Sequence, residues 1–170
     1  MAKDEVYVTG AGGRIELRFA GELSKKMRLW RPTETSPSRD RPVLVADGTW
    51  SKTVWGAEVG AGSVVVAMVA APDELTGEAA EMYFVDERTK RGEILRTSRL
   101  TSEGGPWLRV DVYSSAEKPL RVGYGWYKHF SGIGVVHVGF SGVGSPKEDA
   151  ALGLRLETDL TNLVRSIRVE

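Results

Sequence analysis

The chain has 170 residues, contains no cysteine, and carries 23 basic and 23 acidic side chains, so its formal net charge is zero. A chain of this length can form one domain that buries roughly two thirds of the surface exposed by the unfolded chain. The lack of cysteine excludes disulfides, thiolate metal sites and cysteine nucleophiles. The balanced charge argues against a nucleic-acid partner, and we expect a single domain spanning residues 1–170.

The N-terminal segment and the hydropathy pattern bear on location. Residues 1–5 carry charges where a signal peptide would need an apolar run. No apolar stretch reaches the roughly 20 residues that a membrane-spanning helix requires. We therefore predict a cytoplasmic protein without a membrane span, although an exported protein trimmed of its signal peptide would have the same sequence.

The first forty residues predict a hairpin followed by a loop. Apolar and charged residues alternate on both sides of a glycine-rich turn at residues 10–13, which is the pattern of two half-buried strands. Residues 31–42 contain three prolines, few apolar residues and no periodicity. These features predict an exposed, Pro-rich loop.

The middle of the chain predicts two strands and a helix. Residues 43–45 are expected to form a strand that turns at the Asp-Gly pair of residues 47–48, and the apolar run 63–71 is expected to form a buried strand. The glycine-rich residues 56–62 between them predict a flexible connector. Helix-forming residues over 73–90 then predict the first main helix.

The second half of the chain predicts further strands and a terminal helix. Ser145, Pro146 and Glu148 occupy the positions expected in a capping box, and leucines then recur every three or four residues, as in a helix packed on a sheet. The strands are expected at residues 93–100, 107–113, 121–129 and 134–140. We therefore predict an α+β fold in which a twisted antiparallel sheet is flanked by two main helices.

The last two strands predict an apolar surface that could bind a partner. If Ser131 and Gly132 form a two-residue turn, Trp126 lies opposite His137, and one face of the hairpin carries Tyr124, Trp126 and His137. The other face is apolar too. A strand pair that is apolar on both faces is either covered twice by the chain's own helices or offers one face to a partner.

Three C-terminal segments carry a resemblance to a known family. They are the Tyr-Lys-His-Phe strand end at residues 127–130, the Val-His-Val-Gly-Phe-Ser strand at 136–141 and the Ser-Ile-Arg-Val tail at 166–169. Together with the order of helices and strands, they resemble the PsbP-like fold over residues 43–169. This fold is shared by an extrinsic photosystem II subunit, a Ran-binding nuclear-transport adaptor, bacterial lipoproteins and secretion chaperones. The resemblance implies an accessory protein without catalysis, and it transfers no functional residues.

An alternative interpretation comes from the glycines Gly10, Gly12 and Gly13, which follow an apolar strand as in dinucleotide-binding proteins. Glu16 stands where the third glycine of that motif is expected, and the following residues alternate like a strand rather than a helix. A hairpin turn is therefore favoured, and a nucleotide-binding protein or enzyme remains the alternative.

Two tryptophans and two histidines complete the candidate residues. Trp50 and Trp55 lie just upstream of the predicted connector and form either a binding lip or core plugs. His129 and His137 fall on opposite faces in the predicted register, so they are not expected to share a metal site. We predict a non-enzymatic, chaperone-like or protein-binding module without a cofactor. A protein or peptide would bind at Tyr124, Trp126 and His137 or at Trp50 and Trp55, and a structural or oligomeric component is a further alternative.

Overall fold

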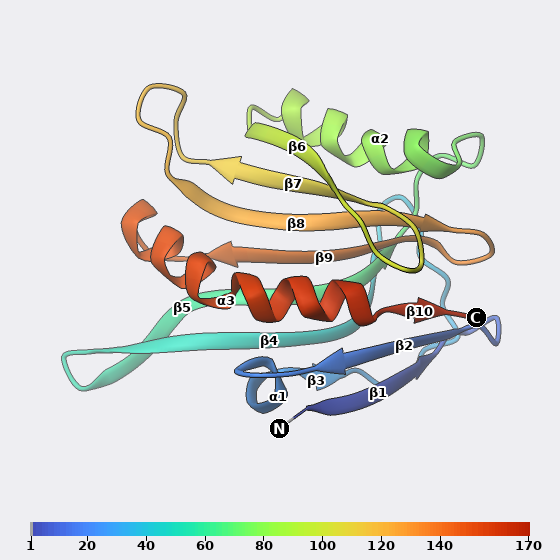
Figure 1. The fold of residues 1–170 in the computed structure, drawn as a ribbon, viewed down its shortest axis with the longest axis horizontal. Helices are drawn as coiled ribbons and strands as arrows, with labels where there is room; N and C mark the ends of the chain where they lie inside the picture. The colour runs from blue at the N-terminus through green and yellow to red at the C-terminus, as the bar shows by residue number, and fades with distance from the viewer. Residues whose placement is uncertain (1) are drawn as a thin grey trace.

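The computed structural model describes residues 2–170 and contains two antiparallel sheets (Figure 1). The larger sheet has seven strands in the order β3-β4-β5-β9-β8-β7-β6, and the smaller has three in the order β1-β2-β10. The strands are β1 (Lys3–Val8), β2 (Arg14–Phe19), β3 (Arg28–Leu29), β4 (Val43–Val54), β5 (Ala57–Val69), β6 (Ile94–Leu100), β7 (Trp107–Tyr113), β8 (Arg121–Phe130), β9 (Gly134–Gly142) and β10 (Arg168–Val169).

Two longer helices pack on opposite faces of the seven-stranded sheet. α3 (Pro146–Ser166) buries a stripe of leucines against β8, β9 and β2, whereas α2 (Gly77–Lys90) packs on β6, β7 and β8. The buried residues accordingly form two clusters, one that contains Trp126 and the α3 leucines and one that contains Tyr127 and Val85 of α2. A third helix, α1 (Leu23–Lys26), is a single turn.

The predicted fold class is wrong. The chain is mostly β, with 45% of its residues in strands and 23% in helices. It contains a second, three-stranded sheet, so the fold is not the predicted single sheet flanked by two main helices. The separate three-stranded sheet arises because β10, at the end of the chain, pairs with β2 near its start, and Val169 lies opposite Ile15. Local sequence patterns do not reveal such a long-range pairing.

The β4–β5 hairpin also differs from the prediction. β4 continues through Asp47 and Gly48, and the predicted connector at residues 56–62 belongs to β5. Gly48 serves close packing rather than a turn, since a Cβ atom there would lie 2.7 Å from Sδ of Met27. The hairpin turns instead at Trp55 and Gly56, whose φ angles are 53° and 77°, as a type I′ turn requires.

The β8–β9 hairpin has the predicted strands but a different register. Phe130 pairs with Gly134, so the connection has three residues instead of the predicted two, and Trp126 lies opposite Val138 rather than His137. A shift of one residue moves a side chain to the other face of a strand. His137 therefore leaves the face that carries Tyr124 and Trp126.

The start of α3 is as predicted. Oγ of Ser145 accepts a hydrogen bond from the backbone N–H of Glu148, whose carboxylate accepts one from the backbone N–H of Ser145, and Pro146 is the first helical residue. The predicted helix over residues 73–90 begins four residues later, at Gly77. The preceding residues form a connection from β5 that lines a cleft.

Candidate functional site

The predicted partner-binding face of the β8–β9 hairpin lies in the interior. Trp126 is completely buried and Tyr124 is 2% exposed, both beneath α3. The Tyr124 hydroxyl donates a hydrogen bond to the Gly153 carbonyl of that helix, at 2.6 Å. Burial raises the pKa of this hydroxyl above its usual range. These two rings therefore hold α3 on the sheet and are not available to a partner.

His137 is packed into the opposite face of the sheet. Its ring stacks on Tyr127 at 4.3 Å between centroids, and its Nδ1 lies 3.1 Å from the backbone carbonyl of Trp126. Burial lowers the pKa of His137 to about 4, so the ring is neutral at physiological pH. His137 acts here as a packing residue.

His129 and His137 share a face of the sheet, contrary to the prediction. In the observed register Tyr127 pairs with His137 and His129 pairs with Val135, so these four side chains lie on the same side of β8 and β9. Within residues 2–170, no three His, Asp or Glu side chains lie close enough together to hold a metal ion.

Trp50 and Trp55 have opposite environments although both lie in one hairpin. Trp50 is 3% exposed and packs in the main core, whereas Trp55 is fully exposed at the tip of the turn. Of the five residues predicted to bind a partner, Trp55 alone presents its whole side chain at the surface. The candidate site therefore narrows to the tip of the β4–β5 hairpin.

This hairpin ends in a projecting two-stranded segment, residues 51–60, which we call the arm. β5 pairs with β9 only from Gly62 onward, so the arm extends beyond the neighbouring strand, and Figure 1 shows it reaching past the rest of the sheet. Its residues are exposed except for half-buried Lys52. Val54 and Val59 lie on one face of the arm, since their cross-strand partners Ala57 and Lys52 alternate with Thr53 and Glu58.

The base of the arm is fixed to the domain while its tip is free. Lys52 forms an ion pair with Glu148 in the first turn of α3, and the backbone N–H of Val143 donates to the Ala61 carbonyl at 3.1 Å. Between residues 53 and 60 the only charged side chain is Glu58. The tip thus presents an apolar strip, and the contacts to the domain lie at the base of the arm.

The backbone at Trp55 is strained. Its φ of 53° is the only positive φ of a non-glycine residue within residues 2–170. For residues other than glycine, asparagine and aspartate, this left-handed backbone conformation costs about 1–2 kcal/mol. Trp55 is also fully exposed, so no burial of its ring offsets this cost. Strain that folding does not explain is a feature of functional positions.

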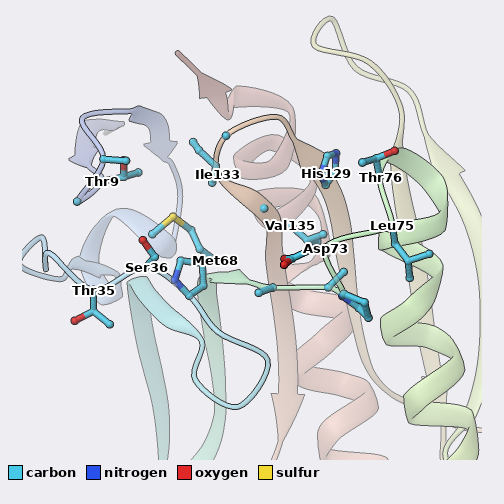
Figure 2. A pocket seen from close by; sticks show the side chains of 18 residues that line it. Thr9, Thr35, Ser36, Met68, Asp73, Leu75, Thr76, His129, Ile133 and Val135 are labelled. Atoms are coloured by element: carbon cyan, nitrogen blue, oxygen red, sulfur yellow. The ribbon is translucent and has the colours of Figure 1, made fainter.

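A cleft lies at the opposite end of the sheet, where four connections meet, and we call it the end cleft. Its volume is about 330 Å³. The β1–β2 turn contributes Thr9, the Pro-rich loop 31–42 contributes Thr35 and Ser36, and the remaining walls come from residues 70–76 and from the β8–β9 connection. Figure 2 shows Thr9, Thr35 and Ser36 on one side, with Asp73, Leu75, Thr76 and His129 on the other.

The lining of the end cleft combines apolar walls with a few polar groups. Half-buried apolar side chains face it from Ala70, Ala71, Pro72, Leu75 and Ile133. Asp73 and His129 supply one carboxylate and one imidazole. Within residues 2–170, the Asp73 carboxylate has no hydrogen-bond or ion-pair partner. The cleft is therefore suited to an apolar group that carries a hydrogen-bond donor.

The glycine turn of the nucleotide-binding alternative forms part of this cleft. Gly10 lines the cleft, and it approaches the Pro-rich loop so closely that a Cβ atom there would lie 2.7 Å from the Glu34 carbonyl oxygen. The turn joins two strands, and Glu16 pairs with Val6 in a hairpin. A phosphate-binding helix N-terminus therefore does not follow these glycines.

Neither a protein-family model nor a curated protein sequence matches the chain. The resemblance to PsbP-like proteins therefore rests on the sequence pattern alone. None of the helices described for residues 2–170 combines the length and apolar character needed to cross a membrane.

Sequence reasoning missed the end cleft and the arm for different reasons. The cleft is assembled from four segments far apart in the chain, and no local motif marks such a meeting point. The arm had a signal, since the Trp55-Gly56 pair separates two runs rich in β-branched residues. The stronger Asp-Gly turn signal upstream obscured it.

Proposed function

We propose that the protein is a non-enzymatic accessory module that binds another protein through the arm, with Trp55 as the anchor. Tryptophan is among the residue types most enriched in the energetic centres of protein interfaces, and Trp55 is fully exposed. Val54 and Val59 extend the apolar contact along the arm, each with more than a third of its surface exposed. In this proposal the protein is cytoplasmic and does not bind nucleic acid.

The observation that carries the proposal is the strained, unburied tryptophan at a projecting tip. A solvated type I′ turn is best served by asparagine and glycine, and an exposed indole there contributes nothing to the fold. The Lys52–Glu148 ion pair and the Val143–Ala61 hydrogen bond hold the base of the arm. These two contacts restrain the base of the arm, which reduces the entropy lost on binding.

The test is site-specific photocrosslinking followed by binding measurements on the purified pair. A photoreactive amino acid replaces Ala57, which pairs with Val54 on the apolar face of the arm beside the anchor, and the chain is expressed in cells of its source. We expect one discrete protein adduct, which disappears when Trp55→Ala is added. With the purified partner, Trp55→Ala should weaken binding by about 2 kcal/mol or more, which is about 30-fold in Kd.

The matched control is Leu154→Ala on α3. Leu154 is also a large exposed apolar residue, 69% accessible, but it lies outside the arm. This variant should give the same adduct and the same affinity as the wild type. The proposal is wrong if the adduct forms equally with Trp55→Ala, or if the purified partner binds both variants alike.

A nucleotide or dinucleotide is the second candidate, and the position of Thr9, Gly10 and Ala11 in the end cleft favours it. Calorimetric titration with NAD(H) and NADP(H) tests this candidate. Saturable binding of either dinucleotide would support it. An absence of heat at millimolar ligand would reject it.

A further inference from the structure

We infer that Trp55 of one copy of the chain occupies the end cleft of a second copy, so that the chains assemble head to tail. This inference rests on the proposed function of the arm and names its partner. The contact would place a residue of one copy inside a cavity of another. Four observations support it: the relative positions of arm and cleft, the size of the cleft, its chemistry and the charge balance of the chain.

The arm and the end cleft lie at opposite ends of the seven-stranded sheet. β5 begins beside Trp55 at the tip, and the residues that follow its last residue, Ala70 and Ala71, line the cleft. The 13 residues of β5, at about 3.3 Å each, separate the two sites by about 43 Å. Figure 1 shows the arm and the β8–β9 connection at opposite ends of the molecule. A chain therefore cannot fill its own cleft with its own Trp55.

The size of the cleft suits one aromatic side chain. Its volume of about 330 Å³ is near the lower limit of the roughly 300–1,000 Å³ found for pockets that hold small ligands. A strand or a helix of a partner would need a longer groove. The projecting tip of the arm is narrow enough to deliver a single indole, because only Gly56 accompanies Trp55 in the turn.

The chemistry of the cleft complements an indole. The ring would pack against the apolar walls at Leu75 and Ile133, and its N–H would donate to an acceptor at the cleft, as most buried indoles do. Asp73 has a free carboxylate at the cleft. The chain already contains a pair of this kind, since Nε1 of Trp30 donates to the Asp47 carboxylate at 3.0 Å.

The electrostatics do not oppose association between copies. The formal net charge is zero, and proteins near zero net charge associate more readily than strongly charged ones. Glu58, the only charged residue near the tip, lies on the face of the arm opposite Val54 and Val59. Because arm and cleft are different surfaces, the interface is heterologous and generates a ring or an open chain of copies.

The experiment is analytical ultracentrifugation of the full chain and of variants that each disable one side of the contact. The wild type should form assemblies larger than a dimer whose mass rises with concentration. Trp55→Ala, which lacks the anchor, and Asp73→Arg, which blocks the cleft at an exposed position, should each sediment as the 18.6 kDa monomer. Self-association should weaken by at least about 30-fold in each case, as for the loss of an interface hot spot.

Mixing the two variants gives the decisive result. Asp73→Arg retains its arm and Trp55→Ala retains its cleft, so an equimolar mixture should form one dimer of twice the monomer mass and nothing larger. Thr76→Arg, at another exposed cleft position, replaces Asp73→Arg if that variant misfolds, and circular dichroism checks each fold. Leu154→Ala should assemble like the wild type.

Two outcomes overturn the inference. One is a wild-type chain that stays monomeric at all concentrations, and the other is a mixture that forms no dimer although both variants are folded. If either occurs while the adduct at the arm still depends on Trp55, the proposed protein-binding function stands and only its assignment to a second copy fails. If the adduct is also independent of Trp55, both fail.

Discussion

Replacing Trp55 by asparagine should stabilise the fold while abolishing binding by the arm. The φ of 53° at this position costs a residue such as tryptophan about 1–2 kcal/mol, whereas Asn-Gly is the preferred pair for a type I′ turn. The side chain is fully exposed, so its removal loses no buried surface. We expect Trp55→Asn to raise the free energy of unfolding by about 1 kcal/mol.

The assay is equilibrium urea unfolding together with thermal unfolding. A gain of about 1 kcal/mol corresponds to a rise of about 2–4 °C in Tm for a domain of this size. Trp55→Ala is the matched control, because alanine at a positive φ relieves little of the strain and should leave the stability nearly unchanged. Both variants should lose binding to the same extent, since both lack the indole.

A loss of 1 kcal/mol or more in Trp55→Asn would refute this reasoning. It would show that the indole packs against the arm in solution and contributes to the fold. Retention of binding in Trp55→Asn would refute the role of Trp55 as the anchor. The combination of higher stability and lost binding is expected only if the strain at this position serves function.

Three further predictions concern the pH dependence of stability, the core and the cap of α3. Because burial lowers the pKa of His137 from 6.5 to about 4, the unfolded chain binds a proton that the folded chain rejects between these pH values. Stability should therefore fall as the pH is lowered across this window, by up to about 3 kcal/mol at about 1.4 kcal/mol per pH unit, and His137→Gln should remove this component in urea unfolding. Trp126→Ala should cost about 3–5 kcal/mol through the cavity that it leaves beneath α3, and a cost below 1 kcal/mol would contradict the interior position of the ring. Ser145→Ala should cost about 0.5–2 kcal/mol through the loss of the α3 cap, and an unchanged urea midpoint would contradict the capping role.

The elements with strong local signals could be predicted from the sequence. The capping box at Ser145 and the leucine stripe after it defined the start and the buried face of α3. Alternating residues on both sides of the turn at 10–13 defined the β1–β2 hairpin. In these cases the residues that carry the signal also make the contacts, so the pattern and the structure agree.

The register of the β8–β9 hairpin could not be predicted because its loop permits two solutions. Gly132 and Gly134 both adopt positive φ, of 82° and 108°, and a two-residue or three-residue connection is compatible with their spacing. The choice between them moves His137 from one face to the other. The predicted surface of Tyr124, Trp126 and His137 depended on that choice and on the position of α3.

The turn of the β4–β5 hairpin was predicted at the wrong position because a glycine can serve either a turn or close packing. An Asp-Gly pair is a strong turn signal, but Gly48 lies within a continuous strand where Met27 packs against its backbone. The residue pair that turns the chain contains a tryptophan, which local preference disfavours there. Sequence patterns follow the average use of a residue and fail where a particular residue departs from that average.

The tryptophans of this chain differ in whether the fold explains their positions. Trp50, Trp107 and Trp126 are buried, and Trp30 is held at the surface by Asp47 and by the guanidinium of Arg28. Trp55 alone has no such contact among the described residues and also occupies a strained backbone. Asparagine is the residue that this turn favours, and in our proposal the tryptophan is there for a contact that the arm makes. The end cleft offers such a contact, because it holds an apolar wall and a free carboxylate at the other end of the same strand.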